Sequence, residues 1–478
     1  MSGSSYDFPY NEKDPKSIEC YGKEMIGKTF QDIFDEHNEF ALAEDRDAFL
    51  DNSYVKSHKK KDYKGGLGNL VEECHFRYKA NSDSHADFPD AGVELKVTPY
   101  KKDSKGLYKA KERLILTMID YINIVKEKSF HESHVWKKCH LMLLVWYLYE
   151  KNKDKMDYKI NFVNLFTPTE EDQKIMEEDY NKILAKIRAG KAHELSEGDT
   201  LYLGAATKAA NSTIRRKQPF SDVPAKPRAF SLKNSYMTYV LNNFFINRKC
   251  AAESITKGQA VSHFEQYIID KITAYKGLSV KELCEKFDLN PKAKNCESAI
   301  AFRILGVKGN RAEEFEKANI IVKAIRLEKN GTIKQSMSFP TFKFKELAKE
   351  IWDDSTFGNY LRETRFFFVV YQDTEDKGFV LKGCQFWNIP YDDLEGNVRE
   401  VWQETHDMIA RGLKFEYKDG TYTSELPKQK DNPVAHVRPH GRNNSDTYEL
   451  PDGRQFPKQC FWLNRKYILS QLDEKLKK

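Results

Sequence analysis

The sequence predicts an α/β protein that is built from two tandem halves. Strands are indicated by the alternating apolar and charged residues 93–97 and by the apolar window 141–147. A helix is indicated over residues 170–190, where apolar residues recur at helical spacing and a glycine follows. Features of the same kind return in the same order after about residue 258, which predicts a second copy of the arrangement.

Length and composition set broad limits on the class of protein. A chain of 478 residues is long enough for two or three domains, each with its own core. No apolar run reaches the roughly 18 residues of a membrane helix, and residues 1–13 lack the hydrophobic region of a signal peptide. The 8 cysteines are scattered singly, which favours reduced thiols in a cytoplasm over a zinc site or a disulfide framework. A net charge of +6 permits nucleic-acid binding without requiring it.

The residues before the alternating strand divide into a lead-in and a basic stretch. Residues 1–54 read as an accessory lead-in, with a helix expected over residues 27–42. Lysines between residues 56 and 64 form a basic run that could contact phosphates. A further amphipathic helix is expected to open over residues 68–76.

Residues 87–96 have the composition and spacing of a metal site that cuts phosphodiesters. Side chains on a strand alternate between faces, so Glu94 and Lys96 share one face. Pro89 and Gly92 predict a turn that returns the Asp87 carboxylate to Glu94. Two carboxylates with water and substrate phosphate suit Mg²⁺, and Lys96 would orient or deprotonate the attacking water. The alternative is an ordinary Glu–Lys pair on an edge strand, with the aspartate capping a turn.

The string Asp-Phe-Pro-x-x-Gly-Val-Glu-Leu-Lys resembles the active-site segment of the MutH family almost letter for letter. This family includes a mismatch-repair nicking endonuclease and the Sau-three-A-type restriction endonucleases that cut GATC, and its motif is a variant of PD-(D/E)xK. The resemblance implies two tandem restriction-endonuclease-like (MutH-like) α/β domains, each with a mixed sheet flanked by helices, the second catalytically degenerate. It also implies that Asp87, Glu94 and the Leu95 carbonyl bind Mg²⁺.

Two further catalytic residues follow from the same resemblance. The family's Gly-x-x-x-Glu segment selects Glu72 when counted from Gly68, whereas counting back from the aspartate selects Glu73, and Glu72 is favoured. The family's Ser-His-Val-x-x-Lys stretch matches residues 133–138, so Lys138 is expected near the scissile phosphate.

Residues that contact DNA are expected in three segments of the first half. Lysines follow the metal motif in a predicted hairpin or loop, and the segment 203–212 is similar to the family's Lys-Ala-Ala-Asn loop that reads the DNA site. Lysine and asparagine are donor types that read guanine and adenine in the major groove. The expected contacts are Lys101, Lys102, Lys208, Asn211, Ser212, Arg215, Arg216 and Lys233. Ala206, Ser231 and Asn234 depart from the family pattern, so a methylation preference does not transfer.

The second half repeats the order of features without the metal motif. Residues 314–323 correspond to residues 87–96 of the first half. Ile321 occupies the position that corresponds to Glu94, and an apolar side chain cannot bind a cation. Donors suited to phosphates and bases remain at Arg438, His440, Arg442, Asn443 and Arg465. The expected domains are a lead-in (1–54), a MutH-like catalytic domain (55–248), a linker (249–265) and a degenerate DNA-binding or allosteric domain (266–478).

The resulting expectation is a cytoplasmic type II restriction endonuclease that hydrolyses double-stranded DNA at GATC with Mg²⁺. Cutting both strands of a palindrome with one active site per chain suggests a homodimer on DNA, and the resemblance implies a companion DNA methyltransferase. Two alternatives stay open: a strand-nicking endonuclease of mismatch repair, which needs no second copy, and a regulatory DNA-binding protein without catalysis.

Overall fold

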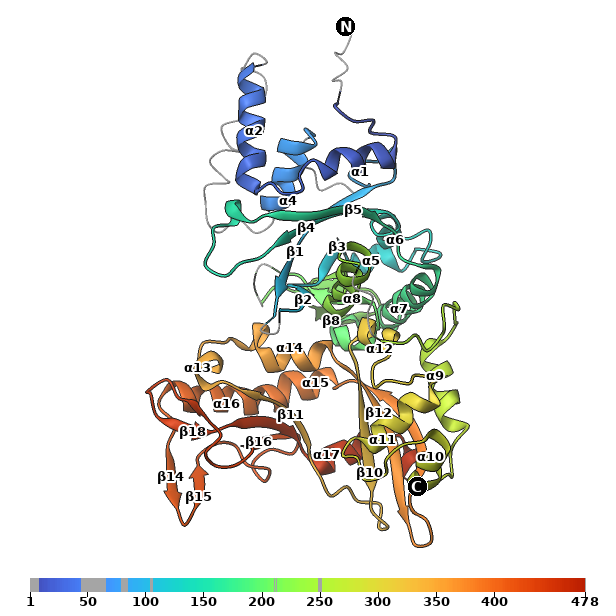
Figure 1. The fold of residues 1–478 in the computed structure, drawn as a ribbon, viewed down its shortest axis with the longest axis vertical. Helices are drawn as coiled ribbons and strands as arrows, with labels where there is room; N and C mark the ends of the chain where they lie inside the picture. Colours follow the sequence, from blue (N-terminus) through green and yellow to red (C-terminus); the bar gives the residue numbers. More distant parts are fainter. Residues whose placement is uncertain are drawn as a thin grey trace. The chain divides into compact units, whose positions relative to one another are not determined.

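The computed structural model describes residues 8–43, 66–78, 85–103, 106–209, 211, 213–247 and 252–477. The chain separates into two compact units (Figure 1). Unit 1 comprises Met1–His193 and Tyr202–Cys250, and unit 2 comprises Glu194–Leu201 and Ala251–Lys478. Within the described ranges, no helix is both long enough and apolar enough to cross a bilayer.

The first sheet of unit 1 is mixed, as the sequence predicts. Its strands are β1 (Glu94–Lys102), β2 (Tyr108–Ala110), β4 (Met142–Leu148) and β5 (Ile160–Phe166), in the order β2-β1-β4-β5. β1 runs parallel to β4 with Glu94 opposite Met142, and the other neighbours are antiparallel. The expected strands over residues 93–97 and 141–147 are therefore confirmed as β1 and β4. The expected lysine-rich hairpin is formed by β1 and β2.

A second, antiparallel sheet of unit 1 carries the loops expected to contact DNA. Its order is β3 (Leu114–Met118), β9 (Arg228–Leu232) and β6 (Leu203–Thr207). Between β6 and β9 in the chain, β7 (Arg216–Gln218) and β8 (Ser221–Ala225) form a separate hairpin.

Helices cover the sheets of unit 1. They are α1 (Pro15–Lys23), α2 (Phe30–Ala43), α4 (Gly66–Leu70), α5 (Tyr121–Ile124), α6 (His134–Lys137), α7 (Glu170–Arg188) and α8 (Asn234–Val240). Single π-helical turns, η1 (Val71–His75) and η5 (Leu241–Phe245), extend α4 and α8. Short 3₁₀ turns are η2 (Lys155–Asp157) and η3 (Ala192–Glu194).

Two of these helices were expected from the sequence. α7 begins where the Thr169 side chain accepts a hydrogen bond from Asp172 N, buries Ile175 and Ile183, and ends before Gly190, whose φ is +70°. α2 begins at Phe30 rather than residue 27, because Thr29 and Asp32 bond to each other's backbone N–H there. Figure 1 shows α1 and α2 on the same side of β4 and β5.

The two main sheets of unit 2 repeat the strand order and directions of the main sheets of unit 1, but they lack a counterpart of β2. β10 (Ile320–Leu327) is parallel to β12 (Arg365–Thr374), which is antiparallel to β13 (Gly378–Trp387). An antiparallel sheet follows in the order β11 (Met337–Phe342), β19 (Gln459–Leu463) and β16 (Ala435–Pro439). Smaller hairpins pair β14 (Phe415–Lys418) with β15 (Thr421–Ser424) and β17 (Thr447–Glu449) with β18 (Gln455–Pro457).

Helices of unit 2 after residue 343 contribute to a large apolar core. The helices of this unit are α9 (Phe264–Thr273), α10 (Val280–Phe287), α11 (Cys296–Ile304), α12 (Glu313–Ala318), α13 (Phe344–Leu347), α14 (Thr356–Glu363), α15 (Tyr391–Asp393), α16 (Arg399–Ala410), α17 (Arg465–Ser470) and α18 (Glu474–Lys477). The 3₁₀ turn η6 (Trp352–Asp354) precedes α14, and the π-helical turn η7 (Leu394–Val398) precedes α16. The aromatic side chains of Trp352 and Trp402 are both buried in this core.

A short segment between α7 and β6 packs in unit 2. It contains the 3₁₀ turn η4 (Glu197–Asp199). Arg365 Nη1 donates to Gly198 O at 3.4 Å, and a Cβ on Gly198 would lie 2.9 Å from the Cβ of Asn388. Because Gly198 has no side chain, this segment lies closer to Asn388 than a larger residue would allow.

Candidate active site

A tight turn brings Asp87 beside the start of β1. Phe88 and Val93 pair through both backbone N–H groups, at 2.9 and 3.2 Å, and Gly92 between them has a φ of +66°. The Asp87 carboxylate then accepts a hydrogen bond of 2.8 Å from Leu95 N. The turn expected at Pro89 and Gly92 is thus present, and it fixes the aspartate against the strand that carries Glu94.

Glu94 lies between two lysines. Its Oε1 is 2.6 Å from Lys96 Nζ, and its Oε2 is 2.9 Å from Lys138 Nζ. The glutamate is only 2 % exposed. Because each carboxylate oxygen has its own cation nearby, the buried negative charge is compensated without a further protein ligand.

Lys138 reaches this glutamate from the end of α6. Ser133 caps that helix by accepting from Trp136 N, and Lys138 follows the last helical residue. Its amine also donates to the His85 carbonyl at 2.5 Å, and the residue is 7 % exposed. The lysine therefore lies inside the carboxylate cluster.

Glu72 belongs to the same electrostatic environment. Burial, and secondly the negative charge of Asp87, raise the pKa of Glu72 to about 7. Burial, and secondly Glu94, raise the pKa of Asp87 to about 6, and Lys96 opposes this shift. Glu73 lies on the same π-helical turn η1.

Aromatic residues that the sequence analysis did not select hold this turn in place. The rings of Tyr21 and His75 stack at 4.3 Å between centroids, and Tyr21 O–H donates to the His75 carbonyl at 3.1 Å. His75 Nε2 lies 3.0 Å from the Tyr21 carbonyl, and Tyr10 O–H donates to Phe76 O at 2.8 Å. The sequence contains 25 tyrosines and 30 phenylalanines, and this abundance does not identify which of them pack together.

The Tyr78 hydroxyl was also missed. This oxygen is buried and has no hydrogen-bond partner among the residues that the structure describes. Burial and the charge of Asp87 raise its pKa, so the phenol stays protonated. No pattern in the sequence distinguishes this tyrosine from the others.

The residues of the site suit a hard divalent cation. In the described ranges, no group of three or more His, Cys, Asp or Glu side chains is arranged as a metal cage. A site made from the Asp87 and Glu94 carboxylates and the Leu95 carbonyl would leave several positions to water and phosphate, as a hydrated divalent cation requires. Burial and, secondly, repulsion from Glu94 raise the pKa of Asp87, and a bound cation would relieve that repulsion.

The residues expected to contact DNA in unit 1 are mostly exposed. Lys101 and Lys102 lie exposed at the end of β1, and the residues after β6 are exposed as well: Lys208, Asn211, Arg215 and Arg216. Lys233 differs, because it is 4 % exposed and its side chain packs near Gly204. Its amine therefore does not share the exposed surface of the others. Ser212 and the lysines of residues 56–64 lie outside the described residues.

Four of the expected contacts in unit 2 lie in or just after the last residues of β16, whereas Arg465 follows β19 at the opposite end of the β16–β19 pair. Arg438 lies over the Trp462 ring at 4.3 Å from its centroid, and the His440 ring meets the same ring edge-on. Arg465 is exposed, and its Nη1 donates to Lys334 O at 3.2 Å. An open polar pocket of about 430 Å³ adjoins this region, lined by Arg442, Asn443, Ser445, Asp446 and Lys458.

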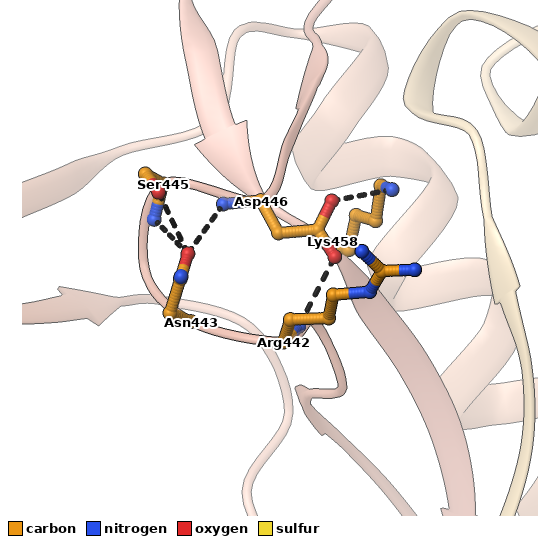
Figure 2. A pocket seen from close by; sticks show the side chains of 5 residues that line it. All are labelled: Arg442, Asn443, Ser445, Asp446 and Lys458. Carbon is orange, nitrogen blue, oxygen red and sulfur yellow. Dashed lines mark hydrogen bonds and ion pairs between the residues drawn. The ribbon is translucent and has the colours of Figure 1, made fainter.

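Figure 2 shows how this pocket is built. Asp446 accepts from Arg442 N at 3.0 Å and pairs with Lys458 Nζ at 2.5 Å. The Asn443 side chain accepts from the backbone N–H groups of Ser445 and Asp446, at 3.0 and 3.1 Å. The loop is therefore held by its own polar groups, while the Arg442 guanidinium remains exposed.

The start of β10 lacks the carboxylates found at the start of β1. Ile320, Ile321 and Val322 stand there, and Ile321 pairs with Phe366. Glu314 precedes the strand, but its carboxylate already accepts hydrogen bonds of 2.7 to 3.0 Å from residues 254–256. This carboxylate has a structural role in closing the loop 254–256 onto α12.

Comparison with known proteins agrees with the geometry of unit 1. The family model described as "DNA mismatch repair enzyme MutH" matches residues 76–179, which include β1, α6 and β4. The DNA mismatch repair protein MutH of Shewanella sp. (strain ANA-3) is 30 % identical over 185 residues, which cover 38 % of this chain and 80 % of that protein. The MutH of Vibrio campbellii is 26 % identical over 198 residues, 40 % of this chain and 84 % of that protein.

A longer relative spans both units. The type II restriction enzyme Sau3AI of Staphylococcus aureus is 36 % identical over 461 residues, which cover 87 % of this chain and 94 % of that enzyme. Such coverage extends far beyond the MutH-matching region. The chain therefore belongs to the MutH-like family of nucleases that includes the type II restriction enzyme Sau3AI.

Proposed function

We propose that this protein is a type II restriction endonuclease that hydrolyses double-stranded DNA at GATC sites with Mg²⁺. The observation that carries the proposal is the cluster at the start of β1, where Glu94 lies between Lys96 and Lys138 and Asp87 is bonded to Leu95 N. Full-length similarity to a type II restriction enzyme supports the reaction class. The GATC target follows from the resemblance of the motif.

Each residue of the cluster has a distinct part in the proposed reaction. Asp87, Glu94 and the Leu95 carbonyl would hold Mg²⁺, which supplies positive charge that stabilises the transition state. Lys96 orients or deprotonates the water that attacks phosphorus, and Lys138 lies near the scissile phosphate. Cleavage of the P–O3′ bond leaves a 5′-phosphate and a 3′-hydroxyl. Glu72 orients Lys96 or a second ion.

Exposed donors beside the site would position and read the duplex. Lys101 and Lys102 supply phosphate contacts from the β1–β2 hairpin, and Arg215 and Arg216 supply them from the start of the β7–β8 hairpin. Base edges would be read by Lys208, Asn211 and Ser212 in the loop after β6. Lys233, being buried, would support that loop through its packing near Gly204.

Unit 2 would be a degenerate second copy that binds DNA. Three features support this: the strand order shared with unit 1, apolar residues at the start of β10, and a Glu314 carboxylate that is fully bonded. The proposed domains are residues 1–54, 55–248, 249–265 and 266–478, except that residues 194–201 belong to unit 2 and residues 1–54 belong to unit 1. Arg438, His440, Arg442, Asn443 and Arg465 would bind a second GATC copy and activate cleavage by the first half.

The cellular setting follows from the same proposal. One active site per chain and a palindromic target favour a homodimer on DNA. A companion DNA methyltransferase would protect the host genome, and the protein would act in the cytoplasm.

Digestion of a plasmid with several GATC sites in Mg²⁺ tests the central proposal. The wild-type protein should give discrete GATC fragments, and Glu94→Gln should give none while still binding the plasmid. Nicked circles alone would support the mismatch-repair activity instead. Binding without any cleavage would support a regulatory DNA-binding protein.

The proposed role of unit 2 is tested by substitutions rather than by truncation. Removal of residues 251–478 would also strip Gly198 and its neighbours of their packing partners. Arg442→Ala with Asn443→Ala should slow cleavage of a two-site plasmid much more than cleavage of a short one-site duplex. Equal rates for this variant and wild type on the two-site plasmid would exclude activation through this loop.

A further inference from the structure

The tip of the β7–β8 hairpin carries an aromatic side chain that folding does not explain. Gln218 pairs with Ser221, so Pro219 and Phe220 form a two-residue turn. Phe220 has a φ of +61°, at the turn position where glycine or asparagine is usual after proline. Its side chain is 73 % exposed, the largest value among the exposed large apolar residues of the described ranges. Neither backbone preference nor burial favours phenylalanine here.

The base of this hairpin is firmly anchored. The buried Gln218 side chain accepts from Ala192 N at 2.7 Å and donates to Val223 O at 2.5 Å. Gly190, after α7, lies so close that a Cβ there would be 2.5 Å from Phe220 O. The tip is thus presented from a fixed position at the end of α7.

Three exposed cations precede the ring in the same hairpin. Arg215, Arg216 and Lys217 are all exposed, and Asp222 is the single acidic residue of residues 215–225, so this stretch has a net charge of +3 − 1 = +2. Val223 is also exposed, at 49 %. An exposed apolar side chain in a basic hairpin is suited to a nucleic-acid duplex, because cations contact phosphates while the apolar group enters between bases.

We propose that Phe220 is a wedge that inserts into the base stack of bound duplex DNA and unstacks one step. Arg215, Arg216 and Lys217 contact the phosphates on either side. The loop that begins at Lys208 leads directly into this hairpin, so insertion occurs at or next to the recognition site. This inference rests on the proposed function, since it takes DNA as the partner.

Fluorescence of 2-aminopurine, which increases when the base is unstacked, tests the wedge directly. The probe replaces adenine within GATC or at each flanking position in a series of duplexes, and Ca²⁺ replaces Mg²⁺ to prevent hydrolysis. Binding of the wild-type protein should raise the fluorescence at one position. Phe220→Ala should bind the duplex but lose most of that rise, whereas Phe220→Leu, which keeps an apolar wedge, should retain part of it.

A matched control and the binding data separate the possible outcomes. Ile351→Ala removes another highly exposed apolar side chain, 65 % exposed in unit 2, and should leave the rise unchanged. Cleavage in Mg²⁺ with no fluorescence rise at any position, or an equal rise for Phe220→Ala, would overturn the wedge and leave the proposed function standing. Failure of the wild-type protein to bind or cut the GATC duplex would overturn both.

Discussion

Glu94 and Lys138 form an almost completely buried ion pair, with 2.9 Å between Oε2 and Nζ, although 44 residues separate them in the chain. Each of two buried charges of this kind is stabilised by the opposite charge of its partner. Loss of Glu94 leaves the Lys138 ammonium buried without its ion-pair partner, which costs far more than an exposed ion pair contributes, whereas Glu94 keeps Lys96 when Lys138 is lost. Stability and chemistry are therefore coupled at Glu94.

Glu94→Gln should abolish cleavage and lower the free energy of unfolding by about 3 kcal/mol, because the Lys138 ammonium stays buried. Urea unfolding of the first unit measures the second effect. The double variant Glu94→Gln with Lys138→Met removes both charges, so it should recover much of the stability while cleavage stays absent. Equal instability of the single and double variants would contradict this account.

Asp87→Asn should stabilise the metal-free protein at high pH. Burial and Glu94 raise the pKa of Asp87 to about 6, from 3.8 for an ordinary aspartate. The folded protein therefore binds this proton more tightly than the unfolded chain does. The stability that this bound proton contributes is fully present below pH 3.8 and is lost as the pH rises through about 6. The raised pKa of Glu72, about 7, likewise makes the folded protein less stable as the pH rises through that value.

Melting temperatures in EDTA at pH 5 and pH 8 measure this effect. The advantage of Asp87→Asn over wild type should be larger at pH 8 than at pH 5. Addition of Mg²⁺ at pH 8 should raise the melting temperature of the wild type and leave the variant unchanged. A difference that is the same at both pH values would show that ionisation of Asp87 does not limit stability.

Glu72→Gln and Glu73→Gln should differ strongly in activity. The pKa of Glu72 responds to Asp87 and Glu94, which couples this carboxyl to the site. Loss of a group that assists proton transfer commonly costs about 10²-fold or more in rate. Single-turnover cleavage should fall by about that factor for Glu72→Gln, while Glu73→Gln stays close to wild type. The reverse order would assign the role to Glu73.

The local part of this site was predictable from the sequence, and the long-range part was not. Strand alternation places Glu94 and Lys96 on one face, and Pro89 and Gly92 predict the turn that returns Asp87. The approach of Lys138 was inferred from a resemblance only, because no local rule predicts a contact across 44 residues. The stacking of Tyr21 on His75 also depends on packing between distant segments, which periodicity does not encode.

Tyr21→Phe should test whether this packing supports catalysis. The substitution keeps the stacked ring but removes the O–H that donates to the His75 carbonyl at 3.1 Å. We expect a loss of about 1 kcal/mol of stability, as for a typical hydrogen bond. The catalytic rate should fall at unchanged DNA affinity, because the π-helical turn that carries Glu72 is less firmly held. Weaker DNA binding at an unchanged rate would contradict this positioning role.

Glu314→Gln in unit 2 is the counterpart of Asp87→Asn and should behave oppositely. The Glu314 carboxylate accepts four hydrogen bonds from residues 254–256, including two from backbone N–H groups, and the residue is 5 % exposed. An amide has one acceptor oxygen in place of two, so part of this network is lost. The second unit should lose about 2 kcal/mol, the typical contribution of a hydrogen bond to a charged group.

The response to metal completes the comparison between the two carboxyls. Glu314→Gln should retain the full rise in melting temperature on addition of Mg²⁺, since its carboxylate is occupied by protein donors and the neighbouring strand begins with Ile320 and Ile321. Differential scanning calorimetry with and without Mg²⁺ measures both effects in one protein. A smaller Mg²⁺ response for Glu314→Gln would show that unit 2 binds the metal, which would contradict its assignment as a degenerate copy.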